Sequence, residues 1–313
     1  MVRLYDRLMV ERWVVDSYGY PESLLADPRL ASLRKDLNPA TVVLIDNVAQ
    51  YYFAHHTTPK GVMDPPETFP QLSPPFPCAF YEYNVDLAMW NVVFTGGPAR
   101  CVRAGILLHA VNPALVRIRG IEESSHLVLA GVLFIQLRRP NSGDTYGPAM
   151  AMFLGIDRDG QATSPLMTQP WGFRDTWMEV VPEHDVRAIC RLAGFALPVF
   201  LAQSFLHCRN VSTQQHVPPP KLSKAFNRRH GRPLVQFKTL AIEPMKEVLR
   251  KQGRIEQNGL PKALHLCRGH FKDYRNSAGL FGKHKGLFWW DMHARGDLEH
   301  GAVVKDYAIK LAK

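Results

Sequence analysis

Charged and imidazole side chains recur at every second position in two segments near the C-terminus. The first, ALHLCRGHFKDY (263–274), carries Arg268 and His270, and the second, LFWWDMHAR (287–295), carries Asp291 and His293. Both segments are typical of strands, whose side chains alternate between two faces. With a turn centred near residues 280–281, antiparallel pairing sets Arg268 opposite His293 and His270 opposite Asp291. We therefore expect four ionisable groups to meet on one surface.

These side chains have the chemistry of a metal-independent ribonuclease site. RNA cleavage needs a base for the 2′-hydroxyl proton, an acid for the leaving oxygen and cations for the charge that develops on phosphorus. His270 and His293 are the predicted base and acid, Arg268 is the predicted cation, and Asp291 is the carboxylate that would orient His270. The alternative is a sheet that contacts phosphate without cleaving it, and this alternative is slightly favoured because the register is assumed.

No metal or cofactor is predicted. A zinc site would use His265, Cys267, His270 and His293, but alternation sets His265 and Cys267 on the face opposite His270, and zinc ligands must converge. The five cysteines are odd in number and form no C-x-x-C pair, which disfavours a disulfide scaffold as well as a four-cysteine zinc site.

Positive charge is concentrated in the last third of the chain. Residues 1–208 hold 17 Lys and Arg against 20 Asp and Glu, whereas residues 209–313 hold 21 against 8. This asymmetry indicates a module for nucleic acid or another anionic surface, with an inert solvated face as the alternative. Aromatic rings in the same region suit unpaired bases. The predicted nucleic-acid contacts are Lys221, Lys224, Arg228, Arg229, Arg232, Lys272, Tyr274, Lys283, Lys285, Trp289 and Arg295.

Residues 222–230 predict a short basic helix. Gly231 stands where a helix C-cap belongs, and cations in the last turn suit the helix dipole. The five cations between residues 221 and 232 nevertheless exceed what capping needs. A phosphate-contact patch is therefore the more economical interpretation.

The strand-like and helix-like segments that must position these side chains are typical of an α+β protein, and the sequence predicts two domains. Residues 1–185 are a β-rich body with helices, in which strand-like runs are separated by turn-forming residues and a proline-rich segment (59–77) forms an extended loop packed on the body. Residues 186–313 are a basic α+β module with an antiparallel sheet, and an apolar, proline-kinked helix at 187–207 ties the halves together. Glu82, in the strand-like run CAFYEYN, is a lone acid and weak evidence for catalysis.

Two stretches of the basic region carry a recurring set of short motifs. CRNVSTQQHVPPPKLSKAFNRRHGRPLVQFKTLAI (208–242) has an R-N-V segment and a basic R-x-x-G-x-P-L helix end, and HLCRGHFKDYRNSAGLFGKHKGLFWWDMHARG (265–296) has an R-G-H strand and a closing W-to-R-G strand. In these features roughly the last hundred residues resemble a family of uncharacterised proteins from phages and other mobile elements. The resemblance implies a viral or prophage origin and draws attention to Asn210, Arg229, Gly231, Pro233, Arg268, Gly269, His270, Trp290 and Arg295. The layout also resembles small RNase toxins, which is an analogy at the level of fold.

These features predict a phage- or mobile-element-encoded protein of the host bacterial cytoplasm that binds RNA or single-stranded nucleic acid, and that cleaves RNA if the two histidines act. The body at 1–185 would contact a host protein. The alternative is a non-enzymatic inhibitor or adaptor that docks a host protein or ribonucleoprotein, and a double-stranded DNA regulator ranks third because no helix-turn-helix pattern is present. The opening residues predict no signal peptide, and 187–207 is too short to span a bilayer.

Overall fold

The computed structural model describes residues 2–14, 30–57, 63–85, 100–115, 121, 125–139, 143–171, 191–243, 263–267, 269–291, 293–295 and 297–302. The chain divides into two compact units. The larger unit comprises Met1–Leu206 and Thr213–Leu240, and the smaller comprises His207–Ser212 and Ala241–Lys313. Each unit is described separately below.

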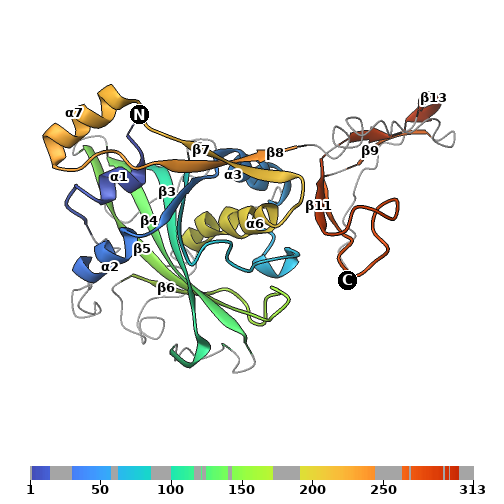
Figure 1. Cartoon of the computed structure of the whole chain (residues 1–313), viewed down its shortest axis with the longest axis horizontal. Coiled ribbons are helices and arrows are strands. Elements are labelled where there is room, and N and C mark those ends of the chain that lie inside the picture. The colour runs from blue at the N-terminus through green and yellow to red at the C-terminus, as the bar shows by residue number, and fades with distance from the viewer. Residues whose placement is uncertain are drawn as a thin grey trace, which may run out of the picture. The chain divides into compact units, whose positions relative to one another are not determined.

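The larger unit is built on an eight-stranded mixed sheet in the order β6-β5-β4-β3-β2-β1-β8-β7, which confirms the predicted α+β class (Figure 1). β1 pairs in parallel with both β2 and β8, and the strands from β2 to β6 form an antiparallel meander. The strands are β1 (Thr41–Leu44), β2 (Cys78–Asn84), β3 (Arg100–Val111), β4 (Leu127–Arg139), β5 (Gly143–Ile156), β6 (Met167–Pro170), β7 (Val211–His216) and β8 (Phe237–Ile242).

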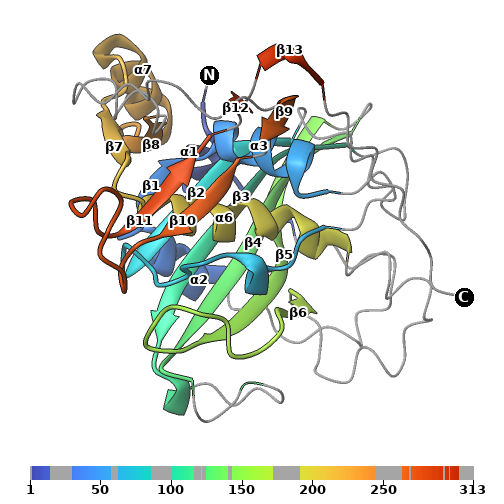
Figure 2. The same ribbon diagram turned by 90° about the vertical axis from the view of Figure 1, so that its right-hand side faces the viewer.

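Helices cover both faces of this sheet. On one face, α1 (Leu4–Leu8) and α2 (Leu30–Leu37) pack with Phe80 and Phe134 in a buried apolar cluster. On the other, α3 (Asp46–His55) packs against α6 (Leu197–Leu206), as Figures 1 and 2 show. Both faces of β2 are therefore buried, which explains why its sequence is almost continuously apolar and aromatic.

The predicted apolar helix takes a different form from the one expected. Within the described part of 187–207, a 3-10 helix (Arg191–Ala196) leads into α6, and Pro198 lies in the first turn of α6, where its missing N–H has no partner to lose. The proline therefore begins the α-helix and does not kink it. In the described part of the chain, no helix has the length and apolar character to cross a membrane.

The described part of the proline-rich segment is an ordered loop packed on the larger unit, as predicted. Phe69 and Leu72 are buried. The Ser204 hydroxyl on α6 donates to the carbonyl of Gln71 at 2.7 Å, and the N–H of Leu72 donates to the carbonyl of Gly160 at 2.8 Å. These bonds satisfy a backbone that proline excludes from regular structure.

A buried carboxylate joins the N-terminal helix to the sheet. Glu82 on β2 has no exposed surface, and its Oε1 and Oε2 accept the N–H groups of Leu4 and Tyr5 at 2.7 and 3.0 Å. The guanidinium of Arg103 on β3 lies 2.6 Å from Oε1. Burial raises the pKa of Glu82, and Arg103 and the two N–H groups act in the opposite direction. The lone acid that offered weak evidence for catalysis is thus held as a structural acceptor for the free N–H groups of α1.

A second buried pair ties α1 to the segment before β8. Arg3 and Asp6 form a salt bridge at 2.8 Å with both side chains buried. Asp6 Oδ1 accepts the N–H of Val235 at 3.1 Å, the Arg3 guanidinium donates to the Val235 carbonyl, and it also lies 4.5 Å from the ring centre of Phe237. Residues separated by more than 200 positions are therefore joined next to β8.

The smaller unit contains two short sheets. β10 (His270–Asp273) and β11 (Leu287–Trp290) form an antiparallel hairpin, and β9 (Ala263–Cys267) pairs antiparallel with β12 (His293–Arg295) and parallel with β13 (Asp297–Ala302). The sequence also predicts a strand over AVVKDYAIKL (302–311) and a helix over MKEVLRKQGR (245–254). The first segment lies almost wholly, and the second wholly, outside the described residues.

The division between the units differs from the predicted boundary between residues 185 and 186. α6 packs on α3, and β8 pairs with β1, so the apolar helix and most of the segment from β7 to β8 belong to the larger unit. The basic residues of the chain are consequently shared between the two units.

Removal of the Glu82 carboxylate will destabilise the larger unit. Glu82→Ala leaves the Arg103 guanidinium and two N–H groups buried without their acceptor, and we expect a loss of about 3 kcal/mol in the free energy of unfolding. Urea unfolding followed by circular dichroism measures this loss. The matched control is Glu67→Ala, which removes an exposed carboxylate and should change stability by less than about 0.5 kcal/mol. Equal stability of the two variants would contradict a structural role for Glu82.

Candidate binding surfaces on helix α7 and on the C-terminal hairpin

α7 (Pro220–His230) is the predicted basic helix, and its ends follow from its sequence. Pro220 occupies the first turn, where no N–H is needed. Gly231 follows the last turn in the left-handed conformation (φ +73°), and its N–H donates to the carbonyl of Asn227 at 2.8 Å. The predicted glycine C-cap is therefore confirmed.

One residue anchors the apolar side of α7. Phe226 is the buried residue of the helix, and its ring lies 4.4 Å from that of His230. The Ser223 hydroxyl accepts the N–H of Leu234 at 3.2 Å, which holds the helix against the segment that follows it. The remaining positions of α7 are exposed or partly exposed.

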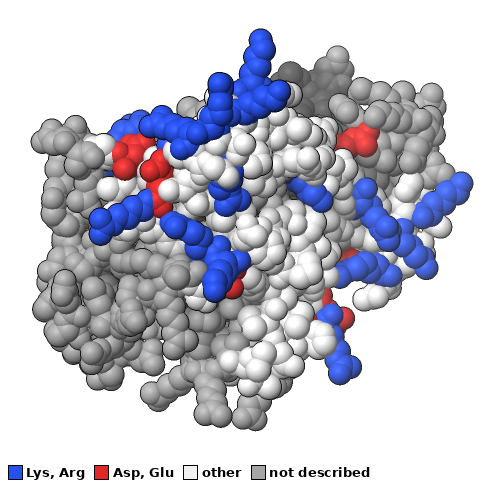
Figure 3. All heavy atoms as spheres, turned by 60° about the vertical axis from the view of Figure 1, so that its left-hand side comes forward, with Lys and Arg blue, Asp and Glu red and all other residues white. Residues whose placement is uncertain are grey.

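The structure brings four of the predicted nucleic-acid contacts together on α7. Lys221, Lys224 and Arg228 follow a spacing of three and four residues, so they lie along one side of the helix, and Arg229 is also exposed. No acidic residue lies within the helix. Lys and Arg gather along the upper edge of the face in Figure 3, on the side where α7 lies in Figure 1.

The fifth predicted contact of this patch is turned partly toward the body of the unit. Arg232 is only partly exposed and lies near the hydroxyl of Tyr5. Burial raises the pKa of Tyr5, and the charge of Arg232 lowers it in part. We therefore define the α7 surface as Lys221, Leu222, Lys224, Arg228 and Arg229.

In the smaller unit, the hairpin register differs by one residue from the expected one. His270 lies opposite Trp290 and not Asp291, and His293 lies opposite Cys267 and not Arg268. The strand pairs, such as Asp273 with Leu287, are centred on residue 280 and not between residues 280 and 281, whereas the tip pair Leu280–His284 is centred on residue 282. The loop is therefore asymmetric. The arm before the tip is thus longer than the arm after it, and the tip does not define the register.

The predicted catalytic group remains a prediction. Arg268 lies outside the described residues, and His293 and Arg295 are described only by their place in β12. His270 and Asp291 are both exposed. Among the described residues, no group of three or more His, Cys, Asp and Glu could hold a metal ion.

The aromatic residues of the hairpin divide into buried and accessible rings. Trp289, a predicted base contact, is buried and packs on Phe271 with ring centres 4.8 Å apart. Trp290 is partly exposed, and the Nζ of Lys272 lies over its ring, 4.1 Å from the ring centre. Tyr274, another predicted contact, is partly exposed and packs edge-on to Phe288 at 6.1 Å. The predicted contacts Lys283 and Lys285 are exposed in the loop.

Two residues to which the mobile-element resemblance drew attention have structural roles. Gly231 caps α7, as described above. Asn210 is buried in the smaller unit, where its Nδ2 donates to the carbonyls of Glu243 and Trp289 at 2.7 and 2.8 Å, and its Oδ1 accepts the N–H of Trp289 at 3.0 Å. Asn210 therefore clamps its own segment to β11.

The thiols of Cys78 and Cys208 do not have the character of nucleophiles. Burial raises the pKa of Cys78 to about 11 and that of Cys208 to about 12. The reactive species is the thiolate, whose population at neutral pH is small at both positions.

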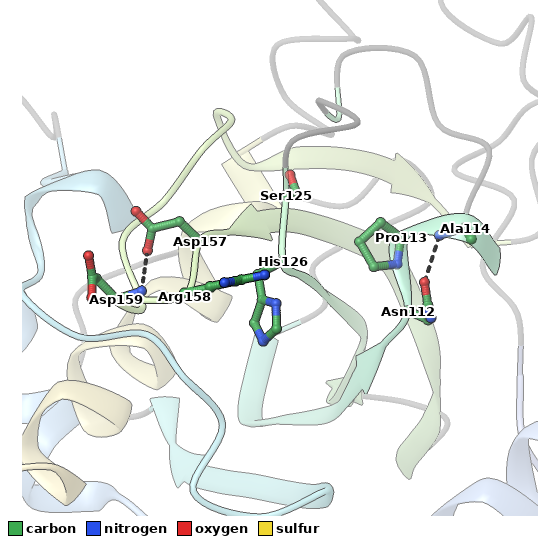
Figure 4. A pocket seen from close by; sticks show the side chains of 8 residues that line it. All are labelled: Asn112, Pro113, Ala114, Ser125, His126, Asp157, Arg158 and Asp159. Carbon is green, nitrogen blue, oxygen red and sulfur yellow. Dashed lines mark hydrogen bonds between the residues drawn. The ribbon is translucent and has the colours of Figure 1, made fainter.

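A pocket of about 600 Å³ lies at one end of the meander (Figure 4). Figure 4 shows Asp157 and Asp159 on one side and Asn112, Pro113 and Ala114 on the other. Asp157 Oδ1 accepts the N–H groups of Asp159 and Gln161, both at 2.8 Å, so this carboxylate closes the turn that follows β5. The acidic side chain of Asp157 is therefore explained by the geometry of the turn.

Comparisons with known proteins give little further information. No family model matches the chain, and no curated protein matches it. Among solved structures, the chain is similar to the crystal structure of AcrVA2, with 15% sequence identity and a TM-score of 0.34 over 85% of this chain and 78% of that chain. This likeness is too low to carry an argument about fold or function.

Loss of the Asn210 side chain will loosen β11. Asn210→Ala removes three buried side-chain hydrogen bonds, and we expect a local loss of about 2 kcal/mol, equivalent to roughly 30-fold faster exchange of the Trp289 amide hydrogen. Hydrogen exchange measured by NMR tests this. Gln214→Ala, an exposed position on β7, is the control and should leave the Trp289 amide unchanged. Unchanged exchange in Asn210→Ala would show that the clamp contributes nothing.

Proposed function

We propose that this protein is a non-enzymatic binding protein, an inhibitor or adaptor, that docks through the α7 surface onto an acidic surface of a host protein. The observation that carries this proposal is the charge of α7, where Lys221, Lys224 and Arg228 line one side of a helix that contains no acidic residue. Neighbouring like charges repel one another, and an acidic partner relieves that repulsion and accelerates the encounter.

Apolar side chains beside these cations favour a protein partner over a phosphate backbone. Leu222 on α7 is 39% exposed, and Val217, shortly before the helix, is 68% exposed. Phosphate contacts need only cations and polar donors, whereas protein interfaces combine apolar anchors with a charged rim. α7 therefore has the composition of a helix that fits an apolar groove with an acidic rim.

The mobile-element resemblance of the C-terminal sequence agrees with this proposal. A protein carried by a phage acts inside a bacterial host, so the expected partner is a host protein, either alone or within a ribonucleoprotein. Binding of RNA by α7, the first sequence-based hypothesis, rests on the same cations and is the competing outcome of the test below.

Photo-crosslinking from α7 tests the proposal. A photoreactive residue in place of Leu222 is introduced into the full chain in bacterial cells, and the adducts are treated separately with ribonuclease and with protease. We expect an adduct of defined mass that resists ribonuclease and is degraded by protease. The variant Lys221→Gln/Lys224→Gln/Arg228→Gln should reduce its yield about tenfold, equivalent to about 1.4 kcal/mol of binding free energy.

Two controls make the crosslinking specific to α7. A photoreactive residue in place of Lys35, an exposed cation on α2, should give no such adduct. The variant Lys35→Gln/Arg158→Gln removes two exposed cations elsewhere in the larger unit and should leave the yield unchanged. An adduct that ribonuclease removes would assign α7 to nucleic acid, and the absence of any adduct would overturn docking through α7.

A further inference from the structure

The tip of the β10–β11 hairpin displays an aromatic ring on a strained backbone. Phe281 has φ +54° and is the only non-glycine residue with positive φ in the described part of the chain. Its side chain is 54% exposed, so more than half of its surface is open to solvent, at a position that glycine or asparagine occupies more easily. Strain of this kind concentrates at sites that hold a side chain ready for a ligand.

Backbone hydrogen bonds hold the tip in a single conformation. The N–H of Leu280 donates to the carbonyl of His284 and the N–H of His284 donates back to that of Leu280, both at 3.1 Å. The N–H of Gly282 donates to the carbonyl of Gly279 at 3.1 Å, and Gly279 and Gly282 both have positive φ. Phe281 is therefore presented by a closed turn, which lowers the entropy that a ligand must overcome.

An aromatic cluster beneath the turn supports it. Phe288 is buried on β11, and Tyr274, Leu280 and Trp290 pack against it. Leu280, the residue before Phe281, thus anchors the tip to the smaller unit. The exposed ring is consequently fixed relative to the hairpin.

Two cations follow Phe281 in the same loop. Lys283 and Lys285 are both exposed within four residues of Phe281. The carboxylate of Asp273, at the end of β10, is paired with Arg275 at 2.7 Å, and the guanidinium lowers the pKa of Asp273. Lys283 and Lys285 therefore contribute positive charge to the loop that this carboxylate does not offset.

We propose that the hairpin tip binds single-stranded nucleic acid, with an unpaired base stacked on Phe281 and flanking phosphates contacted by Lys283 and Lys285. An exposed ring with cations in the same loop matches the way single strands are bound, since every base has a face that stacks and every linkage carries a charge. A protein pocket is the less suitable ligand because an apolar anchor needs an apolar surround to exclude water. In the described part of the smaller unit, Phe281 is the only exposed large apolar side chain.

This inference goes beyond the proposed docking function and is independent of it. The site lies in the smaller unit and uses none of the residues of α7. The sequence predicts nucleic-acid contacts at Lys283 and Lys285 and base stacking on aromatic residues that include Tyr274 and Trp289. Trp289 is buried and Tyr274 is only partly exposed, so we assign the stacking role to the more exposed Phe281.

Fluorescence anisotropy with a labelled oligouridylate tests the site in the full chain. Phe281→Gly removes the ring and also relieves the strained φ, so we expect about tenfold weaker binding together with an unchanged or higher Tm. Phe281→Trp should retain the affinity of the wild type. Lys283→Gln/Lys285→Gln should lower the affinity and reduce the slope of log Kd against log salt by about 1.4, since each phosphate contact on a single strand contributes about 0.7.

The controls separate this site from α7 and from a general effect of charge. Leu115→Ala removes an exposed apolar side chain in the larger unit and should not change binding, and neither should Lys221→Gln/Lys224→Gln/Arg228→Gln. Equal binding by Phe281→Gly and wild type would overturn the stacking role, and absence of any binding to the oligouridylate would overturn the site. A ribonuclease-resistant adduct from a photoreactive residue at position 281 would assign the tip to a protein partner and also overturn the proposal.

Discussion

The buried carboxylate of Glu82 is the constraint on which the larger unit depends. A charge in the interior is tolerated only when donors surround it, and here Arg103 and the first N–H groups of α1 provide them. α1 has only five residues and is too short to be stable alone, so its position is fixed by this acceptor and by its apolar side chains. Through Arg3 and Asp6 the same helix holds the segment that leads into β8.

The placement of α7 follows from that arrangement. The segment before β8 is fixed by α1, β8 pairs with β1, and α7 is therefore carried on the connection between two neighbouring strands. Phe226, the hydrogen bond between Ser223 and Leu234 and the Gly231 cap hold the helix, and most of its other positions are exposed and carry cations and a leucine. A rigid sheet that carries a variable connection is the usual way in which a fold supports a binding surface.

The two candidate surfaces differ in the physical basis of recognition. On α7, several cations lie beside apolar side chains along a helix, which suits an acidic protein surface. At the hairpin tip, an aromatic residue with a strained backbone is followed by two exposed lysines in the same loop, which suits an unpaired base and its phosphates. A ribonucleoprotein would offer both kinds of ligand. The two surfaces share no residue, so substitutions in one can be tested without altering the other.

The sequence by itself determined the features that have local causes. The strand-like apolar runs predicted the strands of the meander, and Gly231 predicted the C-terminal end of α7, because period and glycine act within a few residues. The helix begins at Pro220, two residues before the expected start at Leu222. Only the tertiary structure decided the hairpin register, the role of Glu82 and the display of Phe281. Register depends on how many residues each arm of a loop takes up, burial of an acid depends on donors 21 and 78 positions away, and a left-handed phenylalanine depends on a turn closed by its neighbours. These are long-range or conformational constraints that no local pattern encodes.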